Sequence, residues 1–360
     1  MLLDYILEPP SYGWKDENGN VVKPTPKQIL KEFLSRVNVF ADRKNYLSFL
    51  GWFWVLCLLP FMLLFITKYI TIPLFIVGFI YSMVCMGSHG TIWYHRYCTH
   101  RAYKFSNKFW QIVTQNLVIR LIPEETYVVS HHVHHLKSEL PGDPYNAQCG
   151  FLYCFFADSN HQPVNRNLSE DDYATLSKLL DGQPIVRNTY EQYKKWGSIC
   201  APLPLLLHWV ANWSFWFAAY YFLGEAIGVG GMALACTIFG WAFVWGVGIR
   251  TFNYDGHGQG EDKKVEGIDF HKKDNSINQL WPGFVAGEWH NNHHLYPTGA
   301  RSGFLPYQFD TAWIYIKSLS MIGAVTEYND YKKEFLETYY KPYLSSESTN
   351  KATKPYTDSH

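Results

Sequence analysis

The histidines of this chain fall into three tight clusters whose spacing suits a metal site. The clusters are His95–His100 (HRYCTH), His131–His135 (HHVHH) and His290–His294 (HNNHH). Each cluster follows or adjoins a strongly apolar segment. First-row transition metals are the ions that imidazole suits best, and a set of this size can enclose two of them. The sequence therefore predicts a membrane metalloenzyme.

Helical spacing indicates which of these side chains can act together. In the second cluster, His131, His134 and His135 are spaced i, i+3 and i+4, so they share one helix face. The third cluster repeats these spacings. The two histidines that end the first cluster are five residues apart, which rotates one about 140° from the other. We therefore expect them to approach different metals, or the helix to end between them. Asn253 and His257 are four residues apart and can share a face.

Two long stretches carry almost no charge. Lys68 is the only charged residue from Asn45 to Tyr94, and Glu225 is the only one from Gly197 to Ile249. Each stretch has about 50 residues, enough for two membrane crossings of roughly 20 residues. We predict transmembrane helices at about 46–67, 70–94, 198–222 and 227–250. The alternative, folding of these stretches in water, is disfavoured by the length of the apolar runs.

The cations predict the orientation of these helices. Lys68 lies alone in the turn between the first two predicted helices, and no Lys or Arg lies between the last two. The positive-inside rule then places both termini and both large polar regions in the cytosol. No signal peptide is evident, so we expect the first transmembrane helix to target the chain. The expected location is the endoplasmic reticulum in a eukaryote or the cytoplasmic membrane in a bacterium.

The polar segments are predicted to form further helices, which gives an all-α fold. Ser106 could cap an amphipathic helix lying at the membrane interface. Pro123 opens a second helix, expected to run to about Glu139. Ser169 could cap a short helix that continues through Leu180.

Together these features resemble the membrane fatty acid desaturase family, in particular the acyl-CoA desaturases related to stearoyl-CoA desaturase. The three histidine clusters correspond to the histidine boxes of that family and are called the first, second and third box below. The resemblance covers residues 46–320. It rests on the first box followed by Arg101-Ala-Tyr-Lys104, the second box followed by Asp143-Pro144, and the third box within Gly287–His294. It implies four transmembrane helices with a cytosolic helical cap, residues 95–196 and 251–320. Segments 1–45 and 321–360 would flank this domain. The composition of the tail from about Ser345, rich in Ser, Thr and Lys, predicts disorder there.

The resemblance also implies a site and an activity. Two irons would be bound by nine histidines, with an asparagine holding one iron through water: His95, His100, His131, His134, His135, His257, His290, His293 and His294, with Asn253. The enzyme would use O2 to introduce a cis double bond, most simply Δ9, into a long-chain acyl-CoA. The chain has no haem-binding His-Pro-Gly-Gly motif and no cysteine spacing for an iron–sulfur cluster. Electrons would therefore come from a separate cytochrome b5, ferredoxin or rubredoxin. We expect no nucleic acid among the partners of this chain.

From the residues themselves we expect carboxylates around the histidines, because a metal-bound imidazole usually donates its other N–H to a carboxylate or carbonyl. The candidates by position are Glu125, Glu139, Asp143, Asp255 and Glu288. Tyr127, one turn before the second box, could line an acyl tunnel or simply belong to the core. The remaining histidines are assigned structural or surface roles: His89 and His208 hydrogen-bonded within helices, His132 facing away from the metals, and His161, His271 and His360 on the surface.

Several alternatives stay open. The sequence has Val129-Ser130 where the animal enzymes carry Arg-Asp, so acyl chains on carrier protein or phospholipid remain alternative substrates. Cations that could bind a coenzyme A head group are Lys27, Lys31, Arg36, Arg43, Lys44 and Arg250, although positive-inside bias alone would place them there. The same histidine architecture supports hydroxylases, ketolases and acetylenases. A membrane metal transporter is a further possibility, but its ligands should lie near the bilayer midplane on broken helices.

Overall fold

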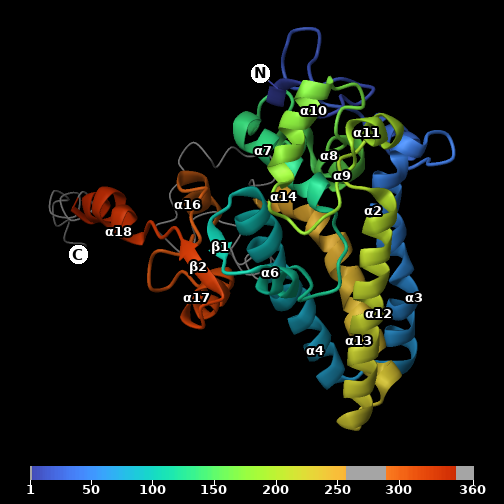
Figure 1. Ribbon diagram of the computed structural model, residues 1–360, viewed down its shortest axis with the longest axis vertical. Helices are drawn as coiled ribbons and strands as arrows, with labels where there is room; N and C mark the ends of the chain where they lie inside the picture. Colours follow the sequence, from blue (N-terminus) through green and yellow to red (C-terminus); the bar gives the residue numbers. More distant parts are fainter. Residues whose placement is uncertain (1, 257–288, 346–360) are drawn as a thin grey trace, which may run out of the picture.

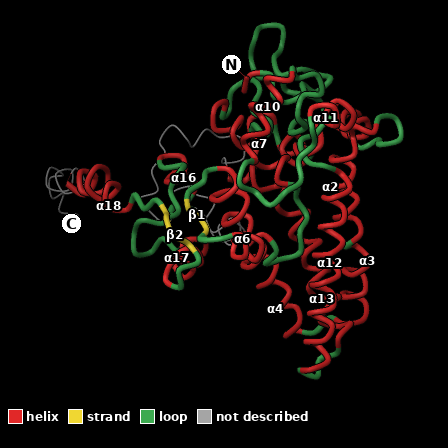
Figure 2. Tube along the Cα trace, viewed as in Figure 1, coloured by secondary structure: helices red, strands yellow, loops and turns green. Residues whose placement is uncertain are grey.

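The computed structural model describes residues 2–256 and 289–345, and most of them are helical (Figures 1 and 2). The helices of the apolar stretches are α2 (Tyr46–Cys57), α3 (Leu59–Leu64), α4 (Ile72–Ile80), α5 (Gly87–His89), α12 (Pro202–Ala226) and α13 (Gly231–Gly248). Irregular helical segments continue them: η2 (Arg43–Asn45), η3 (Phe65–Tyr69), η4 (Tyr81–Met86), η5 (Gly90–Thr99) and η8 (Ile249–Thr251). These helices run side by side, and α7 to α11 gather with the N-terminal segment at one end of them (Figure 1).

The polar part of the chain is built from shorter elements. Before the second box these are η1 (Leu2–Asp4), α1 (Pro26–Arg36), β1 (Tyr103–Phe105) and α6 (Lys108–Gln115). From the second box to α12 they are α7 (Glu124–Lys137), η6 (Ala147–Cys149), α8 (Phe151–Phe155), α9 (Ala157–Asn160), α10 (Glu170–Ser177), η7 (Lys178–Leu180) and α11 (Tyr190–Trp196). The last are α14 (Phe252–Gly256), α16 (His290–Leu295), α17 (Thr311–Met321), β2 (Val325–Tyr328), α18 (Lys332–Phe335) and η10 (Leu336–Tyr340).

Three continuous helical segments of the described chain are long and apolar enough to cross a membrane. They are Arg43–Tyr69, Ile72–Thr99 and Gly231–Thr251. They correspond to the first, second and fourth predicted transmembrane helices. The third corresponds to α12, which has 25 residues and packs along α13 but is less apolar, since it carries His208 and Asn212.

The helix boundaries differ from the predicted ones for local reasons. The third helix begins at Pro202 rather than at 198, because the preceding segment pairs with the chain at Arg187, through an isolated bridge to Cys200. The fourth begins at Gly231 rather than at 227, because Gly228 and Gly230 adopt positive φ angles of 77° and 87° in the turn after α12. Such angles favour glycine and interrupt a helix.

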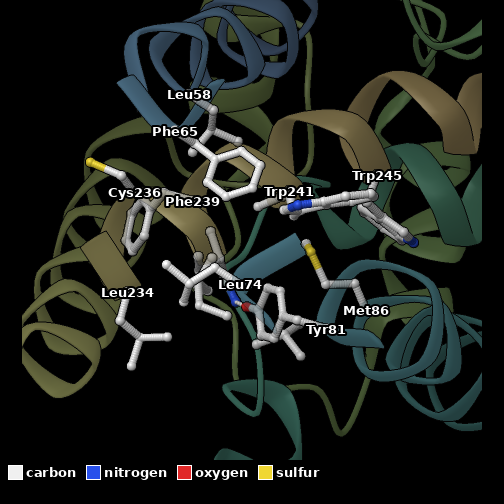
Figure 3. Packing of buried hydrophobic residues seen from close by; sticks show 14 of the residues in the cluster. Leu58, Phe65, Leu74, Tyr81, Met86, Leu234, Cys236, Phe239, Trp241 and Trp245 are labelled. Atoms are coloured by element: carbon white, nitrogen blue, oxygen red, sulfur yellow. Dashed lines mark hydrogen bonds between the residues drawn. The ribbon is translucent and has the colours of Figure 1, made fainter. Parts of the chain in front are cut away.

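The apolar helices pack through one continuous cluster of buried side chains (Figure 3). It includes Phe65, Tyr81, Phe239 and Trp241, which come from η3, η4 and α13. Gly78 of α4 allows the closest approach, since a Cβ at this position would lie only 1.9 Å from Cδ1 of Trp241. Small residues at helix contacts are typical of membrane bundles, where close backbone approach and van der Waals packing drive association.

The fold is not entirely α-helical as predicted, because two short strands form an antiparallel pair. β1 pairs with β2, with Tyr103 opposite Tyr328 and Lys104 opposite Glu327. The first strand is possible because the helix that carries the first box ends at His100 and Arg101 takes a left-handed φ of 49°. The pair joins the end of the first box to the C-terminal part of the chain.

The predicted polar helices are present with shifted ends. α6 is capped by Asn107, not Ser106, through a hydrogen bond to the backbone of Trp110. α7 begins after Pro123 and stops at Lys137, and Glu139 beyond it has a positive φ of 64°. Ser169 caps α10 as predicted, and η7 continues that helix through Leu180. The second box therefore lies within α7, between a start at Pro123 and a sharp turn at Glu139.

Candidate metal centre

Five histidines from all three boxes meet in the interior of the protein. Their ligand nitrogens all lie within 4.8 Å of one another: His95, His100, His131, His135 and His293. Nε2 of His293 is 2.9 Å from Nε2 of His95 and 3.2 Å from Nε2 of His135. The helix carrying the first box ends between its two histidines, since η5 stops at Thr99 and His100 follows it. As a result, both histidines of this box point into the same cluster.

His134 and His294 lie beside this group. The ring of His294 is 4.7 Å from that of His135 and 5.9 Å from that of His134. His257 and Glu288 lie outside the described residues, and so do the side chains of Asn253 and His290. The described part of the site is therefore a five-imidazole cluster with two further imidazoles on one side.

Asp143 lies where a carboxylate was expected. Its Oδ1 accepts a hydrogen bond from Nδ1 of His134 at 2.9 Å, and both side chains are buried. The backbone N–H groups of Glu139 and Tyr145 donate to the same carboxylate, at 2.8 and 3.1 Å. A carboxylate only accepts, so Nδ1 of His134 carries the ring proton and Nε2 keeps its lone pair for a metal.

Tyr145 supports a second ligand and was missed by reasoning from the sequence. Its hydroxyl is 2.8 Å from Nδ1 of His131, and its ring centre is 4.4 Å from that of His134. A metal on Nε2 of His131 leaves Nδ1 protonated, so this nitrogen would donate to the phenol oxygen. The position of Tyr145, two residues after the Asp143 already singled out, is the one signal that could have identified it.

The third box is attached to the first by a buried ion pair. Nη2 of Arg96 lies 3.0 Å from Oδ2 of Asp310, and Nη1 donates to the carbonyl of Ala300 at 2.6 Å. Oδ2 of Asp310 also accepts from the backbone of Ser302, whose carbonyl in turn accepts from the side chain of Asn292 in α16. Burial opposes ionisation of Asp310, but Arg96 and these N–H groups hold its pKa below the usual value. The network sets the position of α16 and hence of His293.

The start of α7 is held by two buried carboxylates. Glu124 pairs with Arg120 at 2.5 Å, and both side chains are fully buried. Glu125 does not lie where we expected: its Oε2 accepts from the backbone N–H groups of Ile199 and Cys200, at 2.9 and 2.7 Å. Burial raises the pKa of Glu125 to about 7, against the effect of these two donors. Both carboxylates orient the second box by anchoring its helix.

Glu139 and Asp255 are two further carboxylates that we expected near the histidines. Glu139 follows α7, and its carboxylate accepts a hydrogen bond from Nε2 of Gln148 at 3.4 Å. Its backbone N–H donates to Oδ2 of Asp143. Asp255 lies in α14 and is half-buried. The ring of Tyr127 stacks on that of His131, with 5.3 Å between ring centres, and Tyr127 both lines a cavity and packs against the hydrophobic core.

The remaining described histidines are structural, with one correction. Nε2 of His89 lies 3.0 Å from the carbonyl of Thr114, and Nε2 of His208 lies 2.9 Å from Oδ1 of Asn116, as expected for hydrogen-bonded roles. The assignment of His161 to the surface was wrong. This side chain is fully buried, and its ring stacks on that of Tyr153 at 3.8 Å, because the N-terminal segment covers it. Tyr12 of that segment hydrogen-bonds His161.

Three of the clustered imidazoles are held neutral. Burial lowers the pKa of His100 to about 3, and burial together with neighbouring imidazoles places the pKa of His131 and His293 well below the usual value. Nε2 of His100 is buried and has no hydrogen-bond partner among the described residues. Several neutral imidazole nitrogens therefore lie close together, and one of them, Nε2 of His100, makes no hydrogen bond with the described residues. This arrangement fits a transition metal, which imidazole binds well.

A cavity adjoins the cluster and extends between the apolar helices. Its volume is about 120 Å³. His95, His131, His134 and Tyr127 line one part of it. Gly87, Leu121 and Trp245 line the part between the apolar helices. An apolar chain that entered this cavity would therefore lie against the histidines.

Comparisons with known proteins agree with this geometry. The family model described as fatty acid desaturase matches residues 70–308. The chain is 26% identical over 243 residues to the sn-1 stearoyl-lipid 9-desaturase of Anabaena variabilis, covering 66% of this chain and 76% of that protein. It is 23% identical over 326 residues to the Delta-9 acyl-lipid desaturase 2 of Arabidopsis thaliana, covering 86% and 92%. It is 28% identical over 281 residues to the hex-5-enoyl-[acyl-carrier protein] acetylenase of Moorena producens, covering 69% and 75%.

Proposed function

The chain belongs to the fatty acid desaturase family and is an oxidoreductase, and on that premise we propose that it introduces a cis Δ9 double bond into a long-chain acyl group. The observation that carries this proposal is the junction of the apolar cavity with the histidine cluster. The overall reaction removes two hydrogens from adjacent methylenes. With O2, two electrons and two protons, these hydrogens leave as two molecules of water.

The three boxes would bind two irons, as the resemblance implies. A pair of irons held there would supply, from dioxygen, the oxidising power needed to remove hydrogen from an unactivated methylene. The protein's own residues prepare this site: Asp143 and Tyr145 hold the Nδ1 atoms of His134 and His131, which directs each Nε2 inward. The apolar side chains of the cavity wall would position the acyl chain.

We also propose the predicted topology. α12 would be the third of four transmembrane helices, because it runs beside α13 over 25 residues without a charge before Glu225. Both termini and the polar part of the chain would be cytosolic, in line with the distribution of Lys and Arg. Electrons would then reach the site from a separate cytosolic donor such as cytochrome b5, ferredoxin or rubredoxin.

The carrier of the acyl chain remains our acyl-CoA prediction, but two structural features give it little support. Val129 and Ser130 are buried, and Arg36 is enclosed by Glu8 and Glu32, so none of these positions offers a free head-group contact. Two of the relatives above are named for acyl lipids and one for an acyl-carrier protein. Acyl-CoA, acyl lipid and acyl-carrier protein should therefore be compared directly as substrates.

The test is gas chromatography–mass spectrometry of lipids from a host expressing the chain, with double bonds located by derivatisation. We expect a new Δ9 monoene, absent with His134→Ala. His132→Ala is the matched control, since this neighbour in α7 lies outside the five-imidazole cluster and should leave the product unchanged. A hydroxy, keto or acetylenic product would instead assign the chain to a sister oxidase. Purified wild-type protein that binds no iron would overturn the metal assignment.

A further inference from the structure

The wall of the cavity contains polar side chains besides the histidines. Among them are Ser48, Asp158, Gln162 and Arg250, and Arg250 donates to Asp158. Asp158 follows Cys154 by four residues, and the Cys154 thiol donates to the carbonyl of Tyr145 beside the cluster. A short stretch of chain, α8 and α9, therefore connects Asp158 in the wall to the metal centre.

Arg250 is the dominant polar group of this region and is held rigidly. Its Nε and Nη2 donate to Oδ2 of Asp158, at 3.1 and 2.7 Å, and its Nη1 donates to the carbonyl of Gly246. The guanidinium lies over the ring of Trp52, 4.2 Å from its centroid, and Nε1 of Trp52 donates to Oδ1 of Asp158 at 3.2 Å. The Arg250 side chain is only 11% exposed.

This arrangement leaves hydrogen-bonding capacity unused. A guanidinium has five N–H groups, and the hydrogen bonds to Asp158 and Gly246 engage three of them. The other two have no partner among the residues that the structure describes. Since Asp158 already balances the charge of Arg250, a neutral acceptor suits this position better than a second carboxylate.

An apolar chain in an apolar cavity has no fixed register, because adjacent methylenes make equivalent contacts. Ligand sites of this kind use a few placed polar groups to fix orientation. We propose that Arg250, held by Asp158 and Trp52, donates to the carbonyl oxygen of the acyl substrate and thereby selects which carbons face the histidine cluster. This inference rests on the proposed function, and it makes Arg250 the residue that determines the position of the double bond.

The test compares two probes of equal length on the purified full chain in detergent. Methyl stearate has the carbonyl, and octadecyl methyl ether lacks it. Both compete with fluorescent methyl cis-parinarate. We expect the wild-type protein to bind the ester about tenfold more tightly than the ether, as for a hydrogen bond to a charged group. Arg250→Met should abolish this preference, while partial misfolding would weaken both probes and leave their ratio intact.

Arg301→Met is the matched control. Arg301 also lies over a tryptophan, 5.3 Å from the centroid of Trp313, donates to the carbonyl of Gly303 and faces a carboxylate, Asp330. It does not line the cavity, so the ester preference should persist in this variant. Stearate is a third probe, and we expect it to bind no better than the ester.

Three results would overturn the proposal: equal affinity of the wild-type protein for ester and ether, a preference that survives Arg250→Met, or stronger binding of stearate than of the ester.

Lipid profiles of the expressing host separate this failure from failure of the proposed function. A wild-type chain that makes the Δ9 monoene without an ester preference refutes only the role of Arg250. An ester preference without any oxidised product refutes only desaturation. In an active enzyme, Arg250→Met should give a mixture of double-bond positions.

Discussion

Arg96 and Asp310 lie 214 residues apart in the sequence, yet the guanidinium and the carboxylate form an ion pair of 3.0 Å in the interior. Arg96 directly follows His95 of the first box, and Asp310 caps α17 after the third box. The pair therefore joins the two ends of the metal site. Arg96 lies within the first box, between its two histidines, whereas Asp310 lies outside all three boxes.

Breaking this pair should displace the third box. Removing one partner of a buried ion pair costs about 3–5 kcal/mol, because the other charge is left uncompensated. We expect Asp310→Asn to lower the thermal stability of the detergent-solubilised protein and to reduce its iron content. Glu327→Gln breaks the exposed pair with Lys104 and is the control. Equal iron content in both variants would contradict the role of Asp310.

Asp143 should govern metal affinity through His134. Without the carboxylate, the Nδ1 proton is no longer held and the ring can adopt other orientations. We expect Asp143→Asn to bind iron roughly 10–100-fold more weakly, which is the usual effect of removing such a support. Titration of the metal-free protein with ferrous iron measures this, with Asp181→Asn at the surface as the control. An unchanged affinity would show that Asp143 only stabilises the turn after α7.

Tyr145 should have a smaller effect of the same kind, because a phenol is a weaker partner than a carboxylate. Tyr145→Phe removes only the hydroxyl group near His131 and keeps the ring. We expect about tenfold weaker iron binding and an altered optical spectrum of the iron-loaded protein. Tyr173→Phe, which removes a buried hydroxyl bound to the carbonyl of Asn188, serves as the control. If both variants behave alike, the hydroxyl of Tyr145 has no specific role.

The metal-free protein should lose stability in mild acid. The pKa of His100, His131 and His293 is lowered by burial, so the unfolded chain binds protons that the folded chain excludes. Stability is therefore complete above the ordinary histidine pKa near 6.5 and falls as the pH drops below it, by up to about 1.4 kcal/mol per pH unit for each histidine. Thermal unfolding between pH 7.5 and 5 checks this. A melting temperature that is constant or rises toward pH 5 would contradict it.

Gly78 should be intolerant of any side chain. A Cβ there would overlap the indole of Trp241, so the helices α4 and α13 must separate. We expect Gly78→Ala to destabilise the protein by about 1–3 kcal/mol, as overpacking does. At Gly248, a Cβ meets no atom within 4 Å, and Gly248→Ala should be neutral or stabilising. Equal melting temperatures of the two variants would exclude the close contact as a constraint.

The sequence by itself determined the chemistry and the coarse architecture of this protein. The spacing of His131, His134 and His135 is a local property of one helix, and the charge-free stretches report directly on their surroundings, so both could be read without a structure. Even the end of the first-box helix between His95 and His100 was one of two predicted outcomes.

Only the tertiary structure decided which other side chains serve the site. The same sequence reasoning placed Glu125 near the metals and His161 at the surface, whereas Glu125 binds the backbone before α12 and His161 is buried under the N-terminal segment. The support from Tyr145 and the position of Arg250 in the cavity wall were not foreseen. Hydrogen bonds such as these join segments that are distant in sequence, and their partners depend on packing directions that no local spacing encodes.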